Sequence, residues 1–219
     1  IALDRTTGAL LWETEMADWR QNYGATGAPL VVGDLVVSGV SGGDEGVRGF
    51  IVAHDQATGK EVWRFWTVPE PGQPGGDTWP PEAWRHGGGS TWVTGAFDPD
   101  LNLVYWGTGN PSPDSYGDVR PGDNLYTDSI VALDGVTLKL KDWLRHDFAF
   151  NSAPIVFDED GKTYVAATAG SRLYVRPRRS VWRQLRQPLA QLPPPASARR
   201  AARPDRAPAP VRWSLQQRG

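Results

Sequence analysis

The chain has 219 residues, a formal net charge of −2, no cysteine, 25 glycines and 11 tryptophans. Without cysteine it can form neither a disulfide nor a thiolate metal site, and no apolar run is long enough to cross a membrane. The composition therefore predicts a β protein rich in turns and aromatic residues, without a transmembrane segment.

An eleven-residue pattern, A-x-D-x-x-T-G-x-x-x-W, occurs without change at residues 2–12 and 53–63. In each copy the apolar residues predict a strand, Asp-x-x-Thr-Gly predicts a turn in which glycine is free to adopt a positive φ, and the tryptophan begins the return strand. The indole can then pack between neighbouring blades. We expect these residues to have a structural role and no catalytic one.

A third copy begins at Ala132, replaces the glycine with Leu138 and holds one extra residue before Trp143. The spacings between copies, 51 and 79 residues, allow one four-stranded blade each plus a long insertion in the second interval. The repeat predicts an all-β fold, a partial β-propeller of two to three blades. Two open faces and a repeat at the first residues are what a fragment without its amino-terminal part, and without any secretory signal, would show.

Two strings imitate a serine hydrolase: G-x-S-x-G at residues 39–43 and His-Gly-Gly-Gly at residues 86–89. In that fold the glycine loop precedes the nucleophile and a helix follows the serine, whereas here the loop comes later and Ser41 leads to a predicted strand. Residues 98–102 begin like a calcium loop, but Leu103 occupies the position of its sixth-position glycine, so a hairpin turn is predicted instead.

Four motifs with coherent spacing carry a stronger signal: S-G-G-D-E-G-V-R-G at 41–49, G-G-G-S-T-W at 87–92, Y-W-G-T-G-N-P at 105–111 and D-N-L-Y-T-D-S-I-V-A-L-D at 123–134. With them the chain resembles, from Ile1 to about Val175, the quinoprotein alcohol dehydrogenases. The resemblance implies a periplasmic, eight-bladed propeller that binds pyrroloquinoline quinone (PQQ) and a calcium or lanthanide ion on its axis. It also implies oxidation of a small alcohol to an aldehyde and electron transfer to a cytochrome c.

The resemblance places two metal ligands in these motifs. Asp44 stands where the family usually has a glutamate, so its carboxylate lies one methylene further back, and Glu45 is a possible substitute in the same string. Asn110 matches the family's amide-oxygen ligand. A carboxylate and an amide oxygen suit a hard cation such as calcium and suit zinc or copper poorly.

The resemblance also places six residues against the quinone. Trp92 matches the tryptophan on which the planar cofactor rests, where an indole offers area and stacking. The others place hydroxyls or closely approaching backbone N–H groups at the cofactor's rim: Thr26, Ser41, Gly42, Gly43 and Ser90. His54 and His86 are expected to be structural.

The catalytic base implied by the resemblance is an aspartate after the third repeat. Aligning residues 151–156 with the family puts Asp147 at that position; aligning His146-Asp147 with the family's earlier His-Asp pair instead leaves no catalytic acid, because residues 148–150 are Phe-Ala-Phe. We prefer Asp147, with His146 as the rival base. On this register Ala149 occupies the place of the extra aspartate of lanthanide-dependent members, which favours calcium.

Composition divides the chain at Val175. Residues 176–219 contain 11 arginines, 8 prolines and one acid, a charge of +10, whereas residues 1–175 carry −12. The sequence therefore predicts a partial quinoprotein propeller at 1–175 and a disordered tail at 176–219. The tail is interpreted either as a basic arm for nucleic acid or membrane or, preferably, as an out-of-frame translation of a GC-rich gene.

Two functions are weighed from the sequence. The first is a fragment of a PQQ-dependent alcohol dehydrogenase, with no nucleic-acid partner. The alternative is a non-catalytic propeller scaffold that resembles an outer-membrane assembly lipoprotein. A scaffold would have no use for Asp44, Ser90, Trp92, Asn110 and Asp147 at these spacings.

Overall fold

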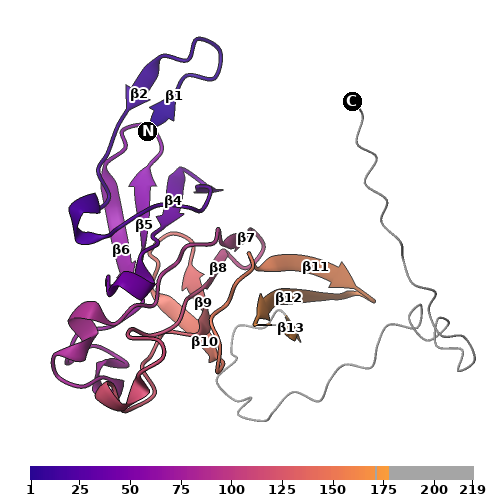
Figure 1. Ribbon diagram of the computed structural model, residues 1–219. Coiled ribbons are helices and arrows are strands. Elements are labelled where there is room, and N and C mark those ends of the chain that lie inside the picture. Colours follow the sequence, from indigo (N-terminus) through magenta and orange to yellow (C-terminus); the bar gives the residue numbers. More distant parts are fainter. Residues whose placement is uncertain (171, 178–219) are drawn as a thin grey trace, which may run out of the picture. The chain divides into compact units, whose positions relative to one another are not determined.

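The computed structural model describes residues 1–170 and 172–177 (Figure 1). Apart from short 3-10 turns, the regular structure of these residues consists of antiparallel strands in four sheets. The first sheet is a hairpin of β1 (Ala2–Leu3) and β2 (Leu10–Trp12). The next has the order β3 (Leu30–Val32), β4 (Leu35–Gly39), β5 (Phe50–Asp55) and β6 (Glu61–Trp66).

Two further sheets follow along the chain. One has the order β7 (Ala96–Asp98), β8 (Leu103–Gly107), β9 (Ser129–Asp134) and β10 (Leu140–Arg145). The other is formed by β11 (Ile155–Glu159), β12 (Lys162–Ala169) and β13 (Arg172–Pro177). The predicted turn at 98–102 is the hairpin between β7 and β8, where the Asp98 carboxylate accepts from the N–H groups of Asp100 and Leu101.

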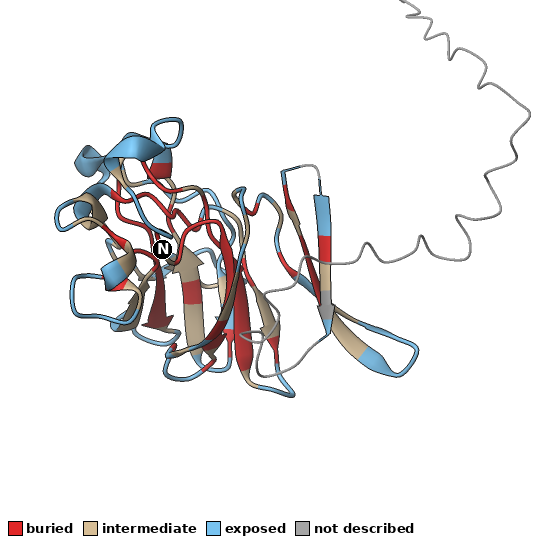
Figure 2. Ribbon diagram, turned by 90° about the horizontal axis from the view of Figure 1, so that it is seen from below, coloured by how far each residue is buried: buried red, intermediate tan, exposed pale blue. Residues whose placement is uncertain are grey.

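Successive sheets are arranged as blades. Each has its first strand at one edge, and β3, β7 and β11 contact one another in that order. A core of fully buried aliphatic side chains fills the space between the first two complete blades; among them are Val37, Ile51, Val104, Val131 and Leu133 (Figure 2). The predicted all-β partial propeller is therefore confirmed.

The repeated tryptophans join neighbouring blades as predicted. The Trp12 indole N–H donates to the Gln56 carbonyl at 2.9 Å, and the Trp63 indole N–H donates to the Val136 carbonyl at 3.1 Å. A Cβ on Gly59, which has a φ of +70°, would lie 2.5 Å from the Trp12 ring. Glycine is thus required at this position for two reasons: the turn needs a positive φ, and the indole leaves no room for a side chain.

The third repeat corrects one prediction. All three copies skip one residue in the pairing, so that Ala2 faces Trp12, Ala53 faces Trp63 and Ala132 faces Asp142. The third copy therefore has no extra residue. Asp142, only 2% exposed, occupies the tryptophan position, and Trp143 lies on the other side of the strand.

The aromatic neighbour of Trp143 is Tyr126, whose ring it meets edge-on at 5.1 Å. Leu138, which replaces the glycine of the third turn, adopts a φ of +46° and is buried in the core. The third copy thus keeps the turn geometry of the others without their glycine.

β13 includes Arg176 and Pro177, two residues assigned to the tail from the sequence. The rest of the predicted tail, residues 178–219, lies outside the described residues. Within the described part of the chain, no helix has the length and apolar character needed to cross a membrane.

Candidate metal and cofactor site

Residues 87–89, all glycine, join the two segments that carry the predicted metal ligands. On one side, the Gly88 N–H donates to the Val47 carbonyl at 3.1 Å and the Gly88 carbonyl accepts from the Gly49 N–H at 2.8 Å. On the other side, the Gly89 N–H donates to the Asn110 carbonyl at 2.8 Å. The glycine string, residues 87–89, is therefore a bridge between the Asp44 loop and the Asn110 loop.

The bridge requires glycine at its centre. A Cβ on Gly88 would lie 2.7 Å from the Asn110 carbonyl oxygen and 2.8 Å from the Ser112 nitrogen, and its φ is +74°. Both the close approach and the left-handed backbone exclude a side chain. The string that imitates an oxyanion loop in sequence thus serves to bring three chain segments together.

Asp44 lies on the 3-10 turn η2 (Gly43–Glu45), which has a left-handed glycine at each end. A Cβ on Gly42, with a φ of +103°, would lie 2.1 Å from the Asn22 carbonyl oxygen. The Asn110 side-chain amide donates to the Asp44 carboxylate at 3.0 Å. Two ligands predicted from motifs 66 residues apart are therefore in direct contact.

Ser90 packs tightly between the same two segments. Its carbonyl accepts from the Gly109 N–H at 2.7 Å, and its Oγ would lie 2.8 Å from a Cβ on Gly43 and 2.9 Å from one on Gly109. The serine is 7% exposed. Glycine at both flanking positions makes room for the Ser90 hydroxyl beside the ligand loops.

The remaining predicted cofactor residues lie on connected loops. Ser41 and Gly24 exchange backbone hydrogen bonds, with Ser41 donating at 2.8 Å. The Thr26 hydroxyl donates to the Trp92 carbonyl at 2.9 Å, so toward a ligand it can only accept. The Trp92 side chain is 39% exposed and offers indole surface for stacking.

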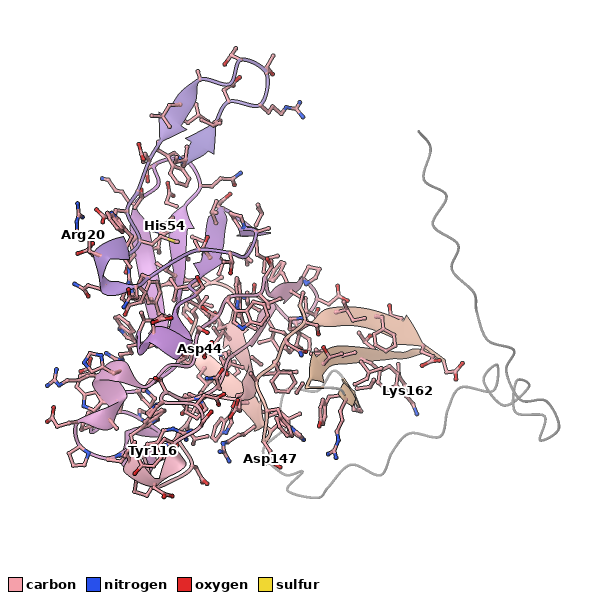
Figure 3. All side chains as sticks on the ribbon, viewed as in Figure 1. Arg20, Asp44, His54, Tyr116, Asp147 and Lys162 are labelled. Carbon is pink, nitrogen blue, oxygen red and sulfur yellow. The ribbon has the colours of Figure 1, made fainter. Side chains whose placement is uncertain are left out.

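Asp147 lies apart from this cluster. It follows β10 in an exposed position, and no hydrogen bond or ion pair joins it to Asp44 or Asn110, all three of which the structure describes. Figure 3 shows Asp44 and Asp147 well separated. The chain on either side is held, because the His146 N–H donates to the Asp128 carbonyl at 2.7 Å and the Phe150 N–H donates to the Thr108 carbonyl at 3.2 Å.

His146, the rival base, has its ring engaged. The Tyr174 hydroxyl lies 2.5 Å from its Nε2, and Phe148 stacks at 6.3 Å. Burial lowers the pKa of His146 below its usual value. A ring held by a tyrosine fits a residue that orients its neighbours.

Asp128 is a buried acid near the site that sequence reasoning did not single out. Its N–H donates to the Gly109 carbonyl at 2.8 Å, next to Asn110, and its Oδ1 has no hydrogen-bond partner within the described residues. Burial raises the pKa of Asp128 to about 7. The sequence signal for this acid is its place directly before Ser129 and the apolar residues 130–133, all of which are buried.

The donor set fits part of a hard-cation shell. Asp44 offers carboxylate oxygens and Asn110 an amide oxygen, the ligand types that calcium and lanthanides prefer. The Asn110 amide turns its nitrogen toward Asp44, so a cation shared by both residues requires that amide to rotate and present its oxygen. The described residues hold no cluster of three or more His, Cys, Asp or Glu suited to a metal.

Comparisons with known proteins identify the family of the chain. The family model for the β-propeller domain of PQQ-type glucose, ethanol and alcohol dehydrogenases matches residues 8–146. Methanol dehydrogenase [cytochrome c] subunit 1 of Methylorubrum extorquens is 39% identical over 158 residues, which cover 64% of this chain and 25% of that protein. The chain spans only 22% to 25% of the length of such curated relatives.

Solved structures show the same architecture. Quinohemoprotein alcohol dehydrogenase from Comamonas testosteroni has a TM-score of 0.74 and 34% identity, covering 81% of this chain and 30% of that one. A europium-containing methanol dehydrogenase has a TM-score of 0.75 and 33% identity, covering 81% and 36%. With a shared fold and most of its length matched, this chain belongs to the β-propeller family of PQQ-dependent alcohol dehydrogenases.

Proposed function

We propose that this chain contributes part of the metal and cofactor site of a PQQ-dependent alcohol dehydrogenase that oxidises a small alcohol to an aldehyde. The observation that carries the proposal is the contact between Asp44 and Asn110 across the glycine string. The name of the methanol dehydrogenase subunit supports a cytochrome c as electron acceptor. The resemblance in sequence supports a periplasmic location.

Asp44 and Asn110 would hold the cation. Calcium is the preferred ion because Ala149 stands where lanthanide-dependent members have a further aspartate. A lanthanide is the other candidate, since one structural neighbour contains europium. Calcium takes roughly six to eight oxygen ligands, so these two residues would supply part of the shell and the cofactor would add to it.

The cofactor residues would position a planar quinone above Trp92. Its exposed indole offers the stacking surface, while Ser41, Ser90 and Thr26 offer hydroxyl groups. Gly42 and Gly43 keep the Asp44 loop free of side chains. When bound, the quinone and its cation supply the hydride acceptor and the Lewis acid.

Asp147 is the proposed general base, which accepts the proton of the substrate hydroxyl while hydride leaves the alcohol carbon. This role rests on the sequence alignment of residues 151–156. His146, held by Tyr174, would orient the same segment. Residues 1–175 form the propeller part in this proposal, and the tail takes no part in the chemistry.

The ligand assignment can be tested on the chain itself with terbium, a hard cation whose emission is excited through nearby tryptophan. Asp44→Ala and Asn110→Ala should each weaken terbium binding at least about tenfold, because each removes an oxygen ligand. Quenching of tryptophan fluorescence by PQQ should depend on the cation in wild type, and this dependence should weaken in the same variants. Glu45→Ala, one residue along the same turn, is the matched control and should leave binding unchanged.

Three results would contradict the proposal. Equal terbium affinity in wild type and Asp44→Ala would exclude Asp44 as a ligand. Loss of binding in Glu45→Ala alone would show that the neighbouring acid is the ligand and that the motif alignment is shifted by one residue. A wild-type chain that binds neither the cation nor the quinone would favour the scaffold alternative.

A further inference from the structure

We propose that His86 is a positioning residue for the cation site, which holds the turn that carries Asp44 in place through a hydrogen bond to Gly46. The inference rests on the function proposed above and extends it to a residue that touches neither the cation nor the cofactor. His86 ends the 3-10 turn η4 (Ala83–His86) and directly precedes the glycine string.

The contact is specific. Nδ1 of His86 lies 3.1 Å from the Gly46 carbonyl oxygen. Because a carbonyl only accepts, Nδ1 must carry the proton, and in the neutral ring Nε2 is left without one. Gly46 closes η2, since its own N–H donates to the Gly43 carbonyl at 3.0 Å. The histidine therefore fixes the residue at which the Asp44 turn ends.

Gly46 lies between the two halves of the ligand set. A Cβ placed on it would lie 3.7 Å from the His86 Cβ and 3.8 Å from the Ser112 Oγ. Ser112 is two residues beyond Asn110, and its N–H donates to the Gly87 carbonyl at 3.0 Å. The end of the Asp44 turn is thus packed against the same segment that carries Asn110.

The Asp44 turn needs such a restraint. Gly42 and Gly46 flank it with φ angles of +103° and +75°, and glycine allows these conformations without favouring them. Asp44 itself contributes one hydrogen bond from Asn110, which a bound cation would displace. When the Asn110 amide has rotated, the His86 contact and the backbone bonds to the Gly42 carbonyl remain to hold the turn.

Removal of the His86 contact should not undo the packing of η4. Trp84, in the same turn, stacks on the guanidinium of Arg48 at 4.6 Å, and Arg48 is held further by Trp66 at 4.2 Å and by the Glu70 carboxylate at 2.9 Å. His86 itself is exposed. A substitution there can therefore change the cation site while leaving the fold intact.

Three variants of the chain separate the hydrogen bond from simple packing. His86→Leu keeps bulk without a donor, and His86→Asn places an amide near the position of Nδ1. Terbium affinity should fall about tenfold in His86→Leu, the loss typical of residues that orient a metal ligand, and should be largely restored in His86→Asn. Arg85→Ala is the matched control. The Arg85 Nε bonds to Glu82 at 3.0 Å and its side chain stacks on Trp84, so the change removes contacts of the same turn but none to Gly46, and terbium affinity should stay unchanged.

Thermal unfolding and Asp44→Ala complete the experiment. Unchanged melting in His86→Leu, weaker terbium binding and rescue by His86→Asn would support the proposal. Unchanged affinity in His86→Leu, or equal losses in the leucine and asparagine variants, would overturn it while Asp44→Ala still abolished binding. If Asp44→Ala also left binding intact, the cation site itself would be wrong and the role of His86 would fall with it.

Discussion

The ligand loops and the base segment of this site are built in different ways. The loops at 41–49, 87–92 and 107–112 are hydrogen-bonded directly to one another, and Asp44 meets Asn110 within them. The base segment at 146–151 is held by backbone hydrogen bonds from His146, Phe150 and Asn151, with Asp147 exposed between them. The ligand loops thus have a geometry of their own, whereas the base depends on a crossing from one blade to the next.

Backbone contacts position the ligand loops, whereas side-chain packing positions most of the base segment. In the ligand loops, glycine lets three backbones approach within hydrogen-bond distance, so the fold itself places the two ligands. In the base segment, Phe148 and Tyr174 pack on His146, and Phe150 packs on Tyr174. The Phe150 N–H joins this segment to the ligand loops at the Thr108 carbonyl, but no described side chain of the segment bonds to Asp44 or Asn110. Substitutions should therefore affect metal affinity and turnover separately.

The largest expected effect tests this separation. In a complete dehydrogenase that contains this segment, Asp147→Asn should lower turnover by about 100-fold, as expected for the loss of a general base. In the chain itself, the same change should leave terbium affinity within about twofold of wild type, because no hydrogen bond or ion pair among the described residues joins Asp147 to Asp44 or Asn110.

His146→Ala is the control for the base. It removes the ring held by Tyr174 and should reduce turnover less than Asp147→Asn does. A larger loss in His146→Ala would make the histidine the base. A collapse of terbium binding in Asp147→Asn would show that the two regions are one unit.

Gly88→Ala should disrupt the ligand loops. The new Cβ would meet the Asn110 carbonyl oxygen at 2.7 Å in a left-handed backbone, so both overpacking and strain apply. We expect a loss of unfolding free energy of about 2–5 kcal/mol together with weaker terbium binding. Urea unfolding and terbium titration of the same preparation would measure both.

Gly33→Ala is the matched control for strain alone. Gly33 has a φ of +56°, but a Cβ there would meet no atom within 4 Å. This variant should lose only about 1–2 kcal/mol of stability and retain terbium affinity. Equal losses in the two variants would show that the close approach at Gly88 does not matter.

Much of this architecture could be predicted from the repeat. Asp-x-x-Thr-Gly and its tryptophan determine a turn and a docking contact over a few residues, and Trp12 and Trp63 make those contacts. The third copy was misread because the position of a tryptophan in sequence does not show which side of the strand it faces. Only the pairing of Ala132 with Asp142 reveals that the acid occupies the docking position.

The part of the site that lies in short local motifs could also be predicted from the sequence. Asp44 and Asn110 lie in short motifs that keep their geometry, and the structure brings them together. The roles of His86 and Asp128 depend on contacts with segments 40 and 19 residues away, at Gly46 and Gly109, and no motif records such contacts. The placement of Asp147 depends on how two blades meet, so its role remains a prediction.

The smallest expected effect concerns Asp128, which lies between the two regions: its N–H bonds to Gly109 of the ligand loops and its carbonyl accepts from His146 of the base segment. Burial raises the pKa of this acid from 3.8 to about 7. Between about pH 4 and 7 the native state therefore keeps a proton that the unfolded chain has lost, so a rise of pH through this window removes stability. The shift corresponds to at most about 4 kcal/mol, and we expect roughly 1–2 kcal/mol because relaxation and water penetration reduce the cost of charging a buried carboxyl.

Asp128→Asn should remove this dependence. The amide cannot ionise, so the difference in unfolding free energy between pH 5 and pH 8 should shrink by roughly 1–2 kcal/mol relative to wild type, with the variant the more stable at pH 8. Asp114→Asn is the control, because Asp114 also raises the pKa of Asp128 but is itself exposed, and it should change the pH profile far less. Other acids, such as Asp134 with a pKa lowered to about 2, stabilise the protein less only as the pH falls. Their contributions above pH 5 are the same in variant and wild type and cancel in the comparison. If wild type and Asp128→Asn lose the same stability between pH 5 and pH 8, Asp128 is already ionised in the native protein at pH 5. The two regions are then linked through an ionised carboxylate and not through a protonated acid.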